Sequence, residues 1–433
     1  MKIFKKIIFY FFLLIILTFG GLFIWQPYLM RVLYYRQPDS VTYKAFPQDV
    51  SHKSNSIFHF IRSPKLRNDI DTLHVLDGNN QSIPFKDYFK NGKLNAFLVI
   101  RNDSILYEKY SSGYSDSTLT TIFSGAKSLV SIMLGEALAD GSIKNLNDQV
   151  TQYIPELKFN PAFNNITLKN LLDMKSGLEF QDALGGVVQA FFSDEAKYYY
   201  THDMKTELMK VKLVNKPGTV WKYKSIDPIL LGWVMEKATG KSVAQYFEEK
   251  IWRNIGTEYN STWGLDHPNG LANTASRFQV TAIDFAKIGR LYLNKGKYNN
   301  KQIVSESWVN QSINIGTEKP ASSKGWQKSA HHYLWWIPQE GENGDYAAEG
   351  MLGQRLYIDP KTNTIIVQFA DHGAGNYPYR KISRYLAGLP FIYPAKINHR
   401  AHWVFTEKKE SCFFSFVLFL CELCGKKLKL IEK

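Results

Sequence analysis

The chain has 433 residues, of which 45% are hydrophobic and 15% aromatic, and it carries a formal net charge of +14. This composition supplies a large core and excludes global disorder. The lysines are scattered and no nucleic-acid-binding motif accompanies them. We therefore interpret the charge as that of a protein beside an anionic membrane and expect no nucleic-acid partner.

The first predicted element is a membrane-spanning helix over residues 7–25, IIFYFFLLIILTFGGLFIW. About 20 apolar residues span a bilayer as a helix. Lys2, Lys5 and Lys6 precede the run and favour a cytoplasmic N-terminus. Because no small-residue cleavage site follows, we expect residues 1–30 to form an uncleaved signal-anchor in the inner membrane, with a removable signal peptide as the alternative. The rest of the chain would then lie on the periplasmic side.

We divide the rest of the chain into a spacer with an N-terminal extension, a folded body and a C-terminal tail: 31–90, 91–395 and 396–433. The only three cysteines, Cys412, Cys421 and Cys424, lie in the tail. Their absence from the body fits an exported domain and excludes a cysteine nucleophile there. Cys421-x-x-Cys424 is half a zinc motif without a second pair, so we expect no metal and interpret the tail as disordered or membrane-touching.

Strands are predicted near both ends of the body. A hairpin is indicated by residues 94–100 and 104–108 around Asn102-Asp103. Its first strand is nearly all apolar, as in strands covered on both faces. Later strand-like runs occupy 333–338, 353–360 and 363–371. These strands can share one antiparallel sheet around an all-helical insertion, which predicts an α+β fold.

Helices are predicted between and after these strands: short ones within 142–180 and 181–215, longer ones over 229–236 and about 281–295, and a last one over 380–387. Gly240 would end the helix over 229–236, and Gly388 with Pro390 the last one.

The predicted helix that carries the candidate nucleophile lies within 120–141, TTIFSGAKSLVSIMLGEALADG. Its apolar residues predict one buried face: Leu129, Ile132, Met133, Ala137 and Leu138. Ser124 and Lys127 are three residues apart, so their side chains would be neighbours on the helix. A lysine whose pKa is lowered by burial can take the proton of a serine nucleophile.

A lone S-x-x-K is a weak motif, but two further features accompany it. Y-K-S at 223–225 follows a turn at Pro217-Gly218, and G-M-L-G-Q at 350–354 opens a late strand. Together the three favour one acyl-transfer site over a chance pair.

Six segments occur in an order and spacing typical of one family: FSGAKSLVSIMLGEALADGSI, ITLKNLLDMKSGLEF, PGTVWKYKSIDPILLGWVMEKATGKS, TAIDFAKIGRLYLNKG, YLWWIP and GMLGQRLYIDP. On these segments, over about residues 90–395, the chain resembles serine hydrolases of the β-lactamase and penicillin-binding-protein superfamily. More narrowly, it is similar to class C β-lactamase-related esterases and 6-aminohexanoate-dimer hydrolases. Y-x-S, the Trp335-Trp336 pair and G-x-x-G-Q favour the dimer-hydrolase branch.

The resemblance implies a role for each matching residue. Ser124 would be the acylated nucleophile, Lys127 its base and Tyr223 the proton relay to the leaving group, assisted by a nearby cation. The backbone N–H groups of Ser124 and Met351 would form the oxyanion hole. No metal or organic cofactor is implied.

The resemblance also implies a wider substrate-binding set. Gly350 and Gly353 would let the strand approach a substrate closely, and Gln354 follows them. Ser225 replaces an asparagine of the family and would either donate a hydrogen bond to substrate or be structural. Trp335, Trp336 and Tyr346 would either line the acyl pocket or pack in the core.

The sequence departs from the β-lactamase pattern at Ala348, where the family has a lysine, or a histidine in many esterases. Glu349 beside it would repel a substrate carboxylate. We therefore expect a simple ester or linear amide as substrate. The alternatives are a penicillin-recognising cell-wall enzyme and a catalytically silent domain that binds peptide or glycan at the membrane.

Other polar residues are expected to be ordinary. His331 and His332 would be a solvated pair before a strand. Most of the carboxylates Asp173, Asp182 and Asp194 would be solvated, and Asp284 and Arg290, in the predicted helix over about 281–295, would be structural.

Overall fold

The computed structural model describes residues 2–63, 66–181, 187–315, 329–338, 344–371 and 379–390. The predictions for Asp182 and for the tail with its cysteines lie outside these residues. Residues 1–389 form one compact unit.

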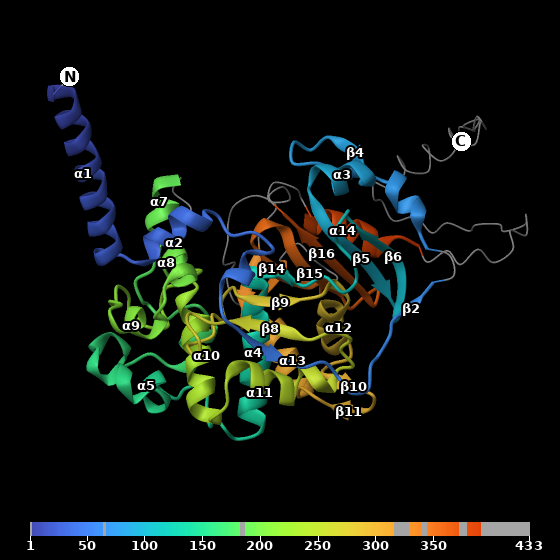
Figure 1. Ribbon diagram of the computed structural model, residues 1–433. Helices are drawn as coiled ribbons and strands as arrows, with labels where there is room; N and C mark the ends of the chain where they lie inside the picture. Colours follow the sequence, from blue (N-terminus) through green and yellow to red (C-terminus); the bar gives the residue numbers. More distant parts are fainter. Residues whose placement is uncertain are drawn as a thin grey trace, which may run out of the picture. The chain divides into compact units, whose positions relative to one another are not determined.

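An eight-stranded sheet built from both ends of the chain organises this unit (Figure 1). Its strand order is β12-β13-β14-β15-β16-β5-β6-β2. β16 (Thr364–Ala370) pairs antiparallel with β5 (Leu94–Arg101), which joins the late strands to the first hairpin. The sheet and the helices inserted between β6 and β12 confirm the α+β prediction. The other strands are β2 (Ile61–Arg62), β6 (Ser104–Tyr110), β12 (Ser329–His332), β13 (Trp335–Pro338), β14 (Tyr346–Gly350) and β15 (Gln354–Asp359).

β5 is buried on both faces because alternate residues enter two separate cores. Leu98 faces the larger core, which includes residues of α4 and α12. Val99 faces the smaller core, which includes residues of α3 and α14. The four helices are α3 (Phe85–Asn91), α4 (Ala126–Ala139), α12 (Ala282–Leu293) and α14 (Tyr379–Gly388). This explains the nearly unbroken apolar run of the strand.

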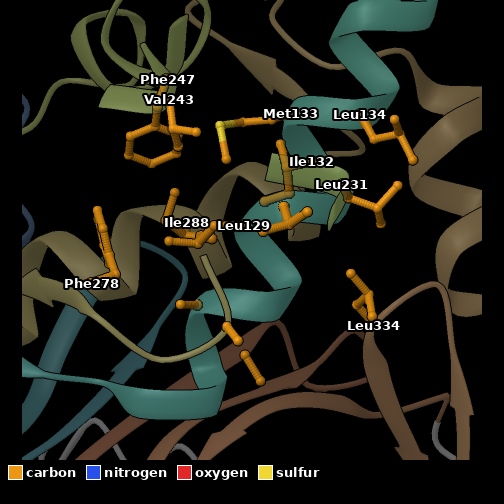
Figure 2. Packing of buried hydrophobic residues seen from close by; sticks show 14 of the residues in the cluster. Leu129, Ile132, Met133, Leu134, Leu231, Val243, Phe247, Phe278, Ile288 and Leu334 are labelled. Carbon is orange, nitrogen blue, oxygen red and sulfur yellow. The ribbon is translucent and has the colours of Figure 1, made fainter. Parts of the chain in front are cut away.

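The helix α4 lies in the middle of the larger core, and the prediction of a single buried face is wrong. Eleven of its 14 residues are buried. Figure 2 shows Met133 pointing toward Val243 and Phe247 on one side of α4, with Leu134 on another. A Cβ on Gly135 would lie 2.5 Å from the Trp308 ring. The helices over Ile226–Thr239 and Val243–Lys250 also contact α4, so the side that would be exposed in a two-layer fold is covered.

The helical region agrees with the predicted helices, and the left-handed Gly240 (φ 68°) ends α10 as expected. Its α-helices are α5 (Val150–Tyr153), α6 (Leu168–Leu172), α7 (Val187–Phe192), α8 (Asp194–Tyr200), α9 (Met204–Met209), α10 (Ile226–Thr239), α11 (Val243–Lys250) and α13 (Glu306–Ile313). Two short 3₁₀ turns, η3 (Phe123–Gly125) and η8 (Met351–Gly353), carry the residues expected at the site.

The segment expected to be a spacer is packed onto the body over much of its length. β1 (Gln48–Ser51) is the edge strand of a second sheet, β1-β8-β9-β7, and pairs with β8 (Ser261–Gly264). β9 (Phe278–Val280) joins β8 to β7 (Thr120–Thr121), which leads directly into η3. The strand β1 is short and not alternating, so its sequence gave no period to recognise.

The N-terminal helix α1 (Lys2–Trp25) contains an apolar stretch, Ile3–Gly21, that is long enough to cross a membrane and has no buried part. The same properties belong to a signal sequence. α2 (Tyr28–Tyr35) follows it and packs against α8.

Candidate active site

The serine and lysine of the S-x-x-K motif meet at the start of α4. The Lys127 amine donates a hydrogen bond of 2.8 Å to the Ser124 hydroxyl and another of 3.0 Å to the Ala275 carbonyl. Lys127 is buried, whereas Ser124 is half-buried and therefore reachable. Burial lowers the pKa of Lys127 to about 8, against a smaller opposing effect of Glu195. About a tenth of this amine is thus neutral at pH 7, and this neutral form can act as a general base.

Tyr223 completes the arrangement from a loop about a hundred residues away. The Lys127 amine lies 5.0 Å from the centre of the Tyr223 ring. Burial raises the pKa of the Tyr223 phenol, and a hydrogen bond with Ser124 opposes this only in part. The cation expected to assist Tyr223 therefore does not bring its pKa below the ordinary value for tyrosine. Tyr223 rests as a neutral phenol, which suits it to pass a proton rather than to act as a standing base.

A buried polar cluster positions the Tyr223 loop. Lys224, next in sequence, donates 3.0 Å to the Ser176 hydroxyl, and Ser176 donates 2.6 Å to Asp227. Burial raises the pKa of Asp227 to about 6, the nearby Lys224 opposing it. These contacts tie the 223–225 motif to the turn after α6.

Gly350 serves a different close approach from the one expected. A Cβ at this position would lie 2.0 Å from the Ile122 carbonyl oxygen. The glycine therefore lets the end of β14 lie against the chain just before Ser124. This contact brings the next residue, Met351, whose side chain is 42% exposed, beside the turn that holds the nucleophile.

The backbone on both sides of this contact is unusual. Phe123, immediately before Ser124, has φ 47°, and Leu352, immediately after Met351, has φ 65°. Non-glycine residues adopt such angles rarely and at a cost of order 1–3 kcal/mol. Both segments are thus held out of regular structure, one directly before Ser124 and the other directly after Met351.

Gly353 and Gln354, expected in the substrate-binding set, are structural. Gly353 has φ 103° in the turn between β14 and β15. Gln354 is fully buried, and its amide donates 2.6 Å to the Ala370 carbonyl. These contacts give both residues a part in shaping the turn that carries Met351.

The aromatic residues divide between site and core. Trp336 stacks on Tyr223, with ring centres 5.5 Å apart. Trp335 and Tyr346 instead pack with Tyr292 in the core, which is the alternative weighed for them. Alternation along β13 sends neighbouring tryptophans to opposite faces.

His331 is buried at the site, so the expectation of a solvated histidine pair is wrong. Its ring meets the Tyr223 ring edge-on at 5.5 Å and the Trp336 ring at 4.7 Å. Its Nδ1 has no hydrogen-bond partner among the described residues. Burial, with Lys127 nearby, lowers its pKa to about 3. His331 is therefore a neutral ring beside Tyr223, and His332 is also buried.

Glu195 on α8 was not singled out by any motif. Both of its carboxylate oxygens lie 2.8 Å from the Ser225 hydroxyl, which donates to them. Its charge acts on Lys127 and on Tyr223, raising the pKa of each. Ser225 thus orients a carboxylate at the site. No sequence signal identified Glu195, because it lies in the aromatic-rich segment 181–215 that has no motif of its own.

The Glu349 charge, expected to repel substrate carboxylates, is compensated. Its carboxylate lies 2.6 Å from the Arg380 guanidinium, and Tyr379 donates a hydrogen bond to it. Ala348 is buried in the larger core. Ala348 therefore still lacks the cation of the β-lactamase pattern. The repulsion of a substrate carboxylate by Glu349, in contrast, is reduced.

The remaining carboxylates are mostly paired. Asp173 is buried 2.6 Å from Lys169, contrary to expectation, and Asp194 pairs with Lys197. Asp284 is fully buried 3.0 Å from Lys287, and Arg290 pairs with Asp103, in agreement with the structural roles expected for both. In the described parts of the chain, no group of three or more His, Cys, Asp or Glu side chains is placed to hold a metal ion.

Comparison with known proteins matches residues 95–387 to the Beta-lactamase family. A 6-aminohexanoate-dimer hydrolase of Paenarthrobacter ureafaciens is 25% identical over 294 residues, covering 64% of this chain and 72% of that protein. A solved structure of a proposed 6-aminohexanoate-dimer hydrolase from Bacillus anthracis has a TM-score of 0.70 at 27% identity, covering 80% of this chain and 92% of that one. A family VIII carboxylesterase shares the fold, with a TM-score of 0.53 at 17% identity over 70% of this chain and 95% of its own. The chain belongs to the beta-lactamase family of serine hydrolases.

Proposed function

We propose that this hydrolase is anchored in the membrane by α1 and cleaves an ester or linear amide outside the cytoplasm through an acyl-enzyme on Ser124. The observation that carries the chemistry is the 2.8 Å contact between the Ser124 hydroxyl and a buried lysine whose pKa is lowered to about 8. The substrate class is supported by the relatives, of which one is named a 6-aminohexanoate-dimer hydrolase and one a carboxylesterase.

In the acylation step, neutral Lys127 takes the hydroxyl proton as the Ser124 oxygen attacks the substrate carbonyl carbon. The carbonyl oxygen becomes an oxyanion, and the backbone N–H groups of Ser124 and Met351 stabilise it. When the carbon–oxygen or carbon–nitrogen bond breaks, Tyr223 gives its proton to the leaving group and receives one from Lys127. The neutral resting state of Tyr223 fits this relay.

Deacylation reverses the proton path. Water takes the place of the leaving group and loses a proton toward Tyr223 and Lys127 as its oxygen attacks the acyl carbon. The Ser124 oxygen leaves with a proton, and the acid product is released. All protons move among Ser124, Lys127, Tyr223 and water, so the reaction needs no further reactant.

The test is labelling of the folded protein with a fluorophosphonate, followed by mass spectrometry of the modified peptide. We expect one adduct, on Ser124, and loss of p-nitrophenyl ester hydrolysis in Ser124→Ala by at least about a thousandfold. An unlabelled Ser124, with Ser124→Ala as active as the wild type, would rule the proposal out.

A further inference from the structure

The helix after the anchor, α2, carries buried apolar residues against the body and exposed apolar residues in its last turn. One side is buried against the body: Tyr28, Leu29 and Val32. Leu33, at the edge of that side, and Tyr34, which projects away from it, are 41% and 80% exposed. On α7, which lies beside α2 (Figure 1), Phe192 is 49% exposed. These neighbouring helices therefore present large apolar side chains that the described part of the chain leaves uncovered.

Chain length keeps α2 close to the end of α1. Only Gln26 and Pro27 separate the two helices. The three Cα–Cα steps from Trp25 to Tyr28 cover at most roughly 11 Å. Gln26 and Pro27 also line a recess of about 500 Å³ whose other walls include residues of α8 and α9. With α1 as an anchor, α2 and the helices it touches lie at the membrane surface.

One apolar cluster connects α2 to the acyl site. Its buried members are Tyr28, Leu29, Val32, Phe46, Phe123, Tyr199 and Tyr200, and Leu352 lies at its edge. Phe123 precedes the nucleophile, and Leu352 follows Met351. Tyr35 stacks on Tyr200 of α8, the helix that also carries Glu195. A single helix, roughly 10–12 Å in diameter, thus stands between α2 and the site.

We propose that the exposed side of α2, together with Phe192, rests in the outer leaflet of the membrane that α1 crosses, and that the site acts on amphiphilic esters or amides held in this leaflet. This rests on the proposed function and names its substrate class. Tyrosine side chains favour the interface between lipid and water. Arg36, the exposed residue that ends α2, suits anionic headgroups. The apolar part of the substrate would stay in the lipid while its ester or amide bond reaches Ser124.

The first experiment measures position and is independent of catalysis. The full chain, with Cys412, Cys421 and Cys424 replaced by serine, is labelled with a fluorophore at Tyr34→Cys and placed in phosphatidylethanolamine–phosphatidylglycerol vesicles. We expect brominated lipids to quench this label. The matched control is Phe159→Cys, at an apolar residue that is 87% exposed on a 3₁₀ turn of the helical region, and we expect no quenching there. Equal quenching at both positions, or a mature N-terminus beyond Pro27, overturns the proposal.

The second experiment measures substrate class in the same vesicles. Soluble p-nitrophenyl acetate is compared with vesicle-embedded p-nitrophenyl palmitate, which has the same leaving group. Two variants lift α2 from the lipid: a flexible Gly-Ser insertion between Gln26 and Pro27, and the pair Leu33→Ser with Tyr34→Ser. We expect the palmitate rate to fall at least about tenfold in both variants, with the acetate rate unchanged. An unchanged ratio of the palmitate rate to the acetate rate in both variants overturns the proposal. Acetate hydrolysis that survives Ser124→Ala overturns the proposed function instead.

Discussion

The Lys127 amine lies 2.8 Å from the Ser124 hydroxyl in a position sealed from solvent. Its neutral form is the one that can accept a proton, and burial lowers its pKa to about 8. The fraction of neutral amine therefore grows as the pH rises through this value. We expect kcat/KM for a p-nitrophenyl ester to rise with pH and to level off above about 8. A rate that is flat from pH 6 to 9 would show that Lys127 is not the base.

Glu195→Gln should move this rising limb to lower pH. The carboxylate raises the pKa of Lys127, and glutamine keeps an acceptor for Ser225 but removes the charge. The control is Glu207→Gln on α9, whose carboxylate pairs with Lys210 and should leave the limb in place. A limb that moves to higher pH, or moves equally in both variants, contradicts the effect assigned to Glu195 on Lys127.

Gly350→Ala should remove most of the activity with little change in substrate binding. The new methyl group would meet the Ile122 carbonyl at 2.0 Å and push the end of β14, with Met351, away from Ser124. Loss of one oxyanion donor typically costs about 10²–10³ in kcat. Gly388→Ala at the exposed end of α14, where a Cβ meets nothing within 4 Å, should leave kcat unchanged. Equal kcat values in the two variants would argue against the close approach as the purpose of Gly350.

His331→Phe should preserve the pH profile of the enzyme. Because burial lowers the pKa of His331 to about 3, the ring is neutral throughout the assay range and acts by packing against Tyr223. Phenylalanine retains that contact, whereas His331→Ala removes it and should lower kcat about tenfold through a misplaced Tyr223. A new titration step in His331→Phe, measured between pH 5 and 9, would indicate a proton-transfer role instead.

Arg380→Gln should destabilise the fold more than a substitution that breaks an exposed ion pair. Arg380 and Glu349 are paired at 2.6 Å with side chains only 6% and 11% exposed. Removing one partner of such a pair costs about 3–5 kcal/mol. Lys237→Gln, which breaks an exposed pair with Glu156, should change the free energy of unfolding by less than about 1 kcal/mol. Urea titrations of both variants measure the difference, and equal midpoints would contradict it.

Nitrocefin should be a poor substrate. The position that holds a cation in β-lactamases is Ala348, which is buried in the core, so no side chain there can bind the β-lactam carboxylate. We expect nitrocefin turnover to be about ten- to a hundredfold slower than that of a simple ester, the loss of one charge-assisted hydrogen bond being about 1.5–3 kcal/mol. Comparable kcat/KM values would restore the alternative of a penicillin-recognising enzyme.

The sequence by itself determined the features that depend on neighbours along the chain. Ser124 and Lys127 meet because residues three apart on any helix are neighbours, and the hairpin strands and the end of α10 at Gly240 follow from local patterns in the same way. The α+β arrangement was also predictable, because the order of strands and helices restricts which sheet can form.

Only the tertiary structure decided how distant segments meet. The Glu195–Ser225 contact, the His331 ring against Tyr223 and the approach of Gly350 to Ile122 join residues that are 30 or more positions apart. Such contacts depend on the packing of the whole core, which also buried α4 on nearly every side and sent Trp335 and Trp336 to opposite faces. Short-range sterics and hydrogen bonds produce local patterns that can be recognised in a sequence. A long-range contact instead depends on many weak packing interactions and produces no recognisable periodicity.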